Sequence, residues 1–215
     1  MRLPPPCSGH PVEETRSKGR IVHSAVDVKS WTKALPSAAA VRPARCLACG
    51  HEGAAPGHPL GLHGHGKRAR LQLGPPDLFA PPELTEVLVR RYQCQRCAAI
   101  TMVAPRDVLA FVRYRASAVV MALAYLAEGR ASPWIREQVS PDRVLGHEGR
   151  RAWRSPSRWA RRARGLWPIR AGPDEDDPMR LARTAVRALA SRAPSPTGQL
   201  LEDAVAGALG GGPRA

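Results

Sequence analysis

The chain has 215 residues, and its 33 Lys and Arg against 18 Asp and Glu give a formal net charge of +15 at pH 7. Only 5% of the residues are aromatic, whereas 22 are proline and 19 are glycine. This composition argues against a large single-core enzyme and allows one domain or two small ones. The charge favours a polyanionic partner, most often nucleic acid, although the GC-rich codons of arginine, alanine, glycine and proline explain part of it.

The first residues, MRLPPPCSGHPVEE, contain no apolar run of the kind found in signal peptides. The longest apolar stretch, 116–127, is shorter than the roughly 20 residues that cross a bilayer. We therefore expect a cytoplasmic protein with no membrane contact. Five cysteines in a reducing compartment then indicate metal or redox chemistry rather than a set of disulfides.

The amino-terminal half of the chain contains short β-type segments. Residues 1–20 carry three consecutive prolines and no periodicity, so we expect a flexible arm there. A short strand and one or two helical turns are expected over 21–35. Residues 67–73 and 86–92 flank the proline-rich stretch GPPDLFAPPE, and they predict two strands joined by a long tip loop.

The following region has helical character. Apolar residues at helical spacing predict a buried helix over 116–128 that stops at Gly129. Three Ser-Pro pairs indicate further helix starts, because serine can cap a helix and proline is tolerated in its first turn. The pairs lie at 132–133, 140–141 and 155–156. The last helix is expected to run from Ser155 to Arg164, with Gly165 beyond its end.

Beyond Trp167 the chain is interrupted by proline and glycine. The acidic run 174–177 suits the start of a helix over 179–191, since carboxylates are stabilised near a helix N-terminus. A second short helix is possible over 199–209. We expect this tail to be loosely attached, and its residues 178–209 are a possible surface for a protein partner.

Four of the five cysteines form two Cys-x-x-Cys pairs, Cys46-Leu-Ala-Cys49 and Cys94-Gln-Arg-Cys97. A two-residue spacer lets both thiolates of a pair reach one tetrahedral ion at about 2.3 Å, and Gly50 suits the turn after the first pair. The 44 residues between the pairs exceed the usual spacing, but a hairpin insertion in a zinc ribbon can absorb them. We therefore predict a structural Zn²⁺ site, whose closed shell of four thiolates leaves no position for a catalytic water.

Two other uses of these residues stay open. A redox Cys-x-x-Cys is expected beside a βαβ pattern, whereas loops and short strands surround the pairs here. His63 and His65 lie between the pairs and could bind metal from one side of a strand, or lie at the surface near phosphates. Cys7 has no partner in this pattern and is treated as incidental.

More than half of the net charge lies between Arg113 and Arg170, where thirteen arginines stand against four acidic residues. Together with the short helices, this distribution predicts a helix-turn-helix-like module whose recognition helix begins at Ser155. Arginine suits such a helix because it pairs with phosphates and contacts guanine edges bidentately. The candidate DNA-binding residues are Arg154, Arg158, Arg161 and Arg162 and, on the hairpin, Lys67, Arg68, Arg70, Arg90 and Arg91. The alternative is a solvated basic face on a small bundle with a tryptophan core.

These elements predict an α+β fold with flexible termini. A zinc-ribbon module with a long hairpin insertion is expected over 21–112, and a basic helix-turn-helix-like module over 113–167. The arm at 1–20 precedes them. A Pro/Gly-rich tail with one or two short helices follows over 168–215.

Four segments carry a resemblance to known proteins: CLACG, LHGHGKRARLQL, VRRYQCQRC and WRSPSRWARRAR. They resemble the amino-terminal region of bacterial insertion-sequence transposases, and still more closely a family of small bacterial proteins with a zinc ribbon and a helix-turn-helix. The resemblance covers 20–167 and implies that Cys46, Cys49, Cys94 and Cys97 bind the metal and that the two modules bind the ends of mobile elements. Such transposases also carry an RNase H-like nuclease domain, which the 48 residues after Trp167 cannot hold.

We therefore expect a zinc-dependent protein that binds double-stranded DNA, is related to transposase amino-terminal regions and is not an enzyme. The sequence shows no Ser/His/Asp or Cys/His arrangement and no Gly-rich phosphate loop. The alternative function is a zinc-ribbon adaptor that binds protein, with a basic charge that largely reflects GC-rich composition.

Overall fold

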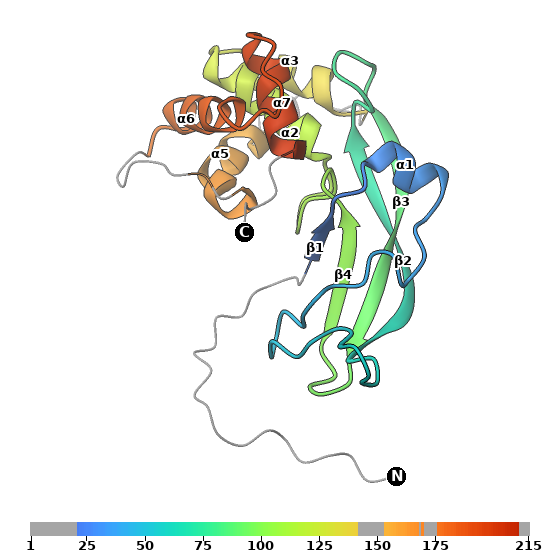
Figure 1. Ribbon diagram of the computed structural model, residues 1–215. Coiled ribbons are helices and arrows are strands. Elements are labelled where there is room, and N and C mark those ends of the chain that lie inside the picture. Colours follow the sequence, from blue (N-terminus) through green and yellow to red (C-terminus); the bar gives the residue numbers. More distant parts are fainter. Residues whose placement is uncertain (1–20, 142–152, 168, 170–175, 211–215) are drawn as a thin grey trace. The chain divides into compact units, whose positions relative to one another are not determined.

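Figure 1 shows the computed structural model, which describes residues 21–141, 153–167, 169 and 176–210. The elements in chain order are β1 (Ile21–Ser24), α1 (Val28–Lys33), β2 (Leu62–Gly74), β3 (Glu83–Cys94), β4 (Ile100–Pro105), α2 (Ala116–Ala127), α3 (Ser132–Val139), α5 (Ser155–Leu166), α6 (Pro178–Ala190) and α7 (Leu200–Gly210). Helices and a four-stranded sheet together confirm the expected α+β class. The arm expected over 1–20, Cys7 and any helix started by the pair at 140–141 lie outside the described residues.

The expected hairpin is formed by β2 and β3, and both strands are longer than the sequence pattern indicated. The strand order in the sheet is β1-β4-β3-β2. β3 and β4 are antiparallel, with Arg90 opposite Val103 and Gln93 opposite Ile100. β4 is not predicted by the sequence pattern. Its six residues are mostly buried, so they lack the alternation of apolar and polar residues that marks a half-exposed strand.

The chain divides into two compact units. Among the described residues, unit 1 comprises 21–22, 36–68 and 89–104, and unit 2 comprises 23–35, 69–88 and the residues after 104. β2 and β3 therefore run through both units. The module boundaries expected at 112 and 167 stay a prediction.

Unit 2 is built around α2. Val119, Val120 and Leu123 of this helix have no exposed surface. α6 and α7 pack against α2, and Val186 of α6 and Ala204 of α7 are completely buried. The expectation of a loosely attached tail is therefore wrong for these two helices. Alanine and glycine at their contacts permit close packing, but they leave only a weak hydrophobic pattern in the sequence.

The helix starts at Ser132 and Ser155 are confirmed, but serine does not cap either helix. Both serines are the first helical residues, and the cap positions before them, Ala131 and Arg154, make no side-chain capping hydrogen bond. The proline of each pair lies in the first turn. Backbone N–H groups there have no acceptor within the helix, so the missing N–H of proline costs no helical hydrogen bond. The acidic turn before α6 does provide a cap, since Asp177 accepts a hydrogen bond from the Met179 backbone N–H at 3.1 Å.

The expected end of α5 at Arg164 is also wrong. Nothing lies within 4 Å of where a Cβ on Gly165 would be, and the helix continues through this residue to Leu166. Trp167 follows with an extended backbone and a buried side chain. No helix among the described residues is long and apolar enough to cross a membrane.

Candidate metal centre and basic surfaces

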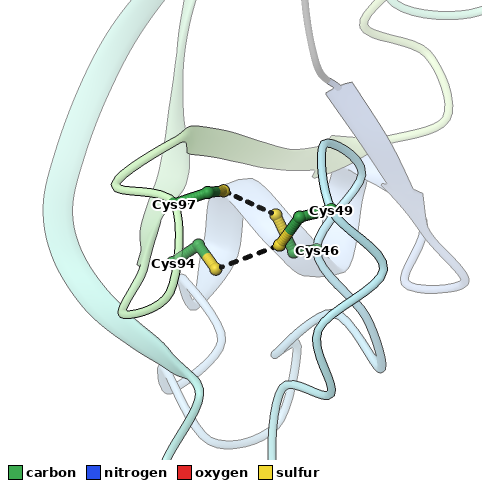
Figure 2. A group of neighbouring side chains, drawn as sticks. All are labelled: Cys46, Cys49, Cys94 and Cys97. Atoms are coloured by element: carbon green, nitrogen blue, oxygen red, sulfur yellow. Dashed lines mark hydrogen bonds between the residues drawn. The ribbon is translucent and has the colours of Figure 1, made fainter. Parts of the chain in front are cut away.

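The four paired cysteines lie together in unit 1. Figure 2 shows Cys46 and Cys49 from one loop facing Cys94 at the end of β3 and Cys97 in the turn between β3 and β4. All four Sγ atoms lie within 4.8 Å of one another, and the pairs Cys46–Cys97 and Cys49–Cys94 are each separated by 3.7 Å. Four sulfurs around a tetrahedral zinc ion at about 2.3 Å are separated by roughly 3.8 Å. The arrangement therefore fits a tetrahedral metal site.

The two Cys-x-x-Cys turns have the same backbone hydrogen bonds. In the first, the Gly50 N–H donates to the Cys46 carbonyl at 2.9 Å and the Cys46 N–H donates to the His51 carbonyl at 2.8 Å. In the second, the Ala98 N–H donates to the Cys94 carbonyl at 2.9 Å and the Cys94 N–H donates to the Ala99 carbonyl at 3.0 Å. Gly50 and Ala98 both have a left-handed backbone, with φ of 71° and 59°. The two turns thus have equivalent backbone conformations.

The surroundings of Cys46 and Cys97 change the pKa of these thiols in opposite directions. Burial opposes ionisation of Cys46, but the backbone N–H groups of Ala48 and Cys49 and the nearby thiols outweigh it and lower the pKa of Cys46 to about 7. Burial raises the pKa of the Cys97 thiol to about 12. Cys46 therefore ionises more readily than Cys97. Binding of a cation would favour the thiolate form of all four cysteines.

The histidines between the two pairs lie outside this cluster. His63 and His65 are exposed on β2, and the His63 Nε2 atom lies 2.7 Å from the Leu60 carbonyl oxygen. Among the residues that the structure describes, the only group of three or more potential metal ligands within reach of one ion consists of the four cysteines.

A cluster of exposed arginines lies on α5 in unit 2. Arg154 at the helix start and Arg158, Arg161 and Arg162 within the helix are all exposed. Trp159, Ala160 and Ala163 are buried on the other side, and the Trp159 ring packs edge-on against Tyr114 with a centroid distance of 4.9 Å. No acidic residue occurs between Trp153 and Trp167. This face of α5 is therefore uniformly cationic.

The basic residues of the hairpin differ in how exposed they are. Lys67 and Arg68 of β2 are exposed in unit 1. Arg90 and Arg91 are half-buried, and the Arg90 Nε atom donates to the Pro36 carbonyl at 2.8 Å. Arg70, which belongs to unit 2, is half-buried and donates to the Leu109 carbonyl at 3.4 Å. Arg70 and Arg90 thus hold backbone segments, whereas Lys67 and Arg68 remain accessible to a partner.

Comparisons of the chain with protein family models, with curated proteins and with solved structures find no match. The proposed function therefore rests on the geometry of the residues. The sequence patterns located the four cysteines and the α5 arginines. They did not identify Ala98. A glycine such as Gly50 suggests a left-handed backbone, whereas an alanine does not.

The equivalence of the two turns leads to a prediction about their stability. An L-residue with a Cβ is disfavoured in the left-handed region by roughly 1–2 kcal/mol relative to glycine. Ala98→Gly should therefore stabilise the metal-bound protein by about 1 kcal/mol, and Gly50→Ala should destabilise it by a similar amount, in denaturant unfolding. Ala54→Gly, at an exposed loop position without positive φ, is the matched control. Equal effects of Ala98→Gly and Ala54→Gly would contradict the argument.

Proposed function

We propose that this protein binds duplex DNA and that a structural Zn²⁺ ion stabilises the module formed around its four cysteines. The proposal treats unit 1 as a zinc ribbon and the helices of unit 2 as a helix-turn-helix-like module. Zinc is favoured because four thiolates at tetrahedral spacing are typical of structural zinc sites. Metal analysis of the purified protein should give one zinc ion per chain.

The exposed arginine face of α5 is the observation that supports DNA binding most strongly. Arg158, Arg161 and Arg162 follow helical i, i+3, i+4 spacing, so they lie on one side of the helix. An α-helix has a diameter of about 10–12 Å with its side chains, which matches a major groove about 12 Å wide. The buried Trp159 anchors the opposite side in unit 2. A helix held in this way can present its arginines to phosphates and guanine edges together.

Exposed aromatic side chains would be expected for a protein that stacks single-stranded bases. On α5 the aromatic residue Trp159 is buried, and no aromatic ring lies on its cationic face. A cationic helix face without aromatic rings favours contact with the backbone and groove of a duplex. We therefore place duplex DNA ahead of single-stranded nucleic acid as the partner.

Replacement of Arg158, Arg161 and Arg162 by alanine tests the assignment of α5. Each lost phosphate contact should reduce the slope of log K against log salt by about 0.9, so the triple variant should lose up to roughly 2.7 from this slope. Affinity for a random duplex at low salt should fall by roughly tenfold or more. Fluorescence anisotropy over a salt series measures both quantities.

A variant with the same change in charge provides the control. Arg113, Arg180 and Arg187 are exposed in unit 2 outside α5, and their replacement by alanine should leave most of the slope intact. Equal slopes for the two triple variants would show that α5 is not the contact surface. Tight binding of a protein partner that is insensitive to salt, without DNA binding, would instead favour the adaptor function.

The proposed function is binding without strand-transfer chemistry, in keeping with the resemblance to transposase amino-terminal regions. Strand transfer by two metal ions needs carboxylates held close together by a folded domain. Among the described residues, no cluster of carboxylates meets this condition. The zinc ion in the proposal stabilises the fold and takes no part in a reaction.

A further inference from the structure

We propose that a cavity in unit 2 binds a small amphipathic monocarboxylate, that is, a single carboxylate group attached to an apolar body. The cavity has a volume of about 500 Å³. This lies within the range of about 300–1,000 Å³ that is usual for small-molecule sites. The turn before α1, the tip loop of the hairpin, the segment before α2 and helix α7 form its wall. DNA binding by α5 makes no use of it.

Most of the wall is apolar. The side chains that provide this surface are Val26, Val28, Pro76, Leu78, Val205 and Leu209. They come from three separate segments of unit 2, so the cavity depends on the tertiary fold and cannot be read from any local motif. A wall of this kind favours the aliphatic or aromatic body of a ligand.

The carboxylates of the wall already have partners. Asp27 accepts a hydrogen bond from a backbone N–H in the first turn of α1 at 2.9 Å. Asp77 pairs with Lys29 at 2.8 Å. Asp107 is buried and accepts from both the backbone N–H and the hydroxyl of Ser117, at 3.2 and 3.3 Å. A cationic ligand would have to compete with these interactions.

Arg106 is the arginine of the wall, and it has unused hydrogen-bonding capacity. Its Nη1 atom donates to the Leu209 carbonyl at 3.1 Å and to the Gly210 carbonyl at 2.6 Å, so this part of the side chain caps the end of α7. A guanidinium group has five N–H donors. The donors on Nε and Nη2 have no acceptor among the described residues, and Arg106 lines the cavity.

These unused donors determine the head group of the ligand. A guanidinium edge matches a planar carboxylate with two parallel hydrogen bonds. Asp27, Asp77 and Asp107 stand around the same cavity, and they would repel a doubly charged phosphate more strongly than a singly charged carboxylate. One arginine edge and an apolar wall therefore suit a monocarboxylate such as a medium-chain fatty acid.

Octanoate is a suitable probe for the full-length, metal-bound protein. Isothermal titration calorimetry should show saturable binding of one octanoate per chain. In methyl NMR spectra, the signals of Val26, Val28, Val205 and Leu209 should shift. Octan-1-ol and octylamine have the same apolar chain but lack the carboxylate. Their affinity for the protein should therefore be lower than that of octanoate by about tenfold or more. Equal affinity for octanoate and octan-1-ol would overturn the proposal.

Two variants test the assigned residues. Arg106→Met should weaken octanoate binding about tenfold or more, whereas Arg113→Met, at an exposed arginine that does not line the cavity, should leave it unchanged. Because Arg106 also caps α7, Ala25→Phe serves as an independent test that narrows the cavity and leaves the guanidinium in place. This variant should abolish octanoate binding. Octanoate affinity that survives both Arg106→Met and Ala25→Phe, or an absence of saturable binding to the unmodified protein, would refute the site.

Discussion

Removal of the metal should unfold unit 1 while the helices of unit 2 stay folded. Among the described residues of unit 1, few apolar side chains are buried. Apart from Cys46 and Cys94, they are Pro43, Leu62, Val89, Tyr92, Val103 and Ala104. Structural zinc contributes an apparent binding free energy of about 10–16 kcal/mol in small zinc modules, which is comparable to the whole stability of an ordinary domain. Unit 1 is therefore expected to depend on its metal.

Hydrogen exchange can measure this difference within a single sample. After complete chelation, amides of the segments 43–53 and 89–104 should lose their protection, whereas amides of α2 and α6 should keep most of theirs. The second set is an internal control, because α2 and α6 pack in the core of unit 2 and hold no metal ligand. Unchanged protection of 43–53 and 89–104 after metal removal would show that the cysteine cluster does not hold unit 1 together.

Substitution of single ligands should reproduce the effect of the chelator. Changes to groups that merely support a ligand typically cost about 10–100-fold in metal affinity, so loss of a thiolate should cost more. Cys46→Ser and Cys97→Ser should both lose bound zinc and show the same exchange pattern as the chelated protein. Cys7→Ser is the matched control, and it should keep one zinc ion per chain.

The candidate metal site was predictable because metal ligation imposes a local rule on the sequence. A two-residue spacer and a glycine after the second cysteine are recognisable without any knowledge of the fold. The structure brings Cys46, Cys49, Cys94 and Cys97 together as the pattern predicted. The role of Ala98 was not predictable, because its left-handed backbone is imposed by the turn and not by the residue type.

The helices and the hairpin could be predicted from periodicity and turn residues, but their packing could not. β4 is too short and too buried to alternate, so no period marks it. The attachment of α6 and α7 rests on small side chains, which contribute little to a hydrophobic pattern and much to close approach. The cavity near Arg106 could not be predicted from the sequence either, because its wall is formed by segments more than a hundred residues apart.

Gly207 of α7 lies at a close contact between α6 and α7. A Cβ on this residue would overlap the Leu189 carbonyl oxygen of α6 and lie 2.8 Å from the Leu189 carbonyl carbon. Backbone atoms cannot rotate away as a side chain can, so Gly207→Ala must force the two helices apart. Overpacking of a core costs about 1–3 kcal/mol, and a clash with backbone should reach or exceed the upper end of that range. Thermal and denaturant unfolding of unit 2 should report this loss.

Gly165 of α5 provides the opposite expectation for the same substitution. It is an exposed glycine within a helix, and nothing lies within 4 Å of where its Cβ would be. Gly165→Ala should therefore stabilise unit 2 by about 0.5–1 kcal/mol, because alanine loses less conformational entropy on helix formation. Opposite signs for the two variants would establish that α7 is held by a backbone contact with α6. A neutral or stabilising Gly207→Ala would show that α7 is attached loosely enough to move away, as the sequence alone suggested.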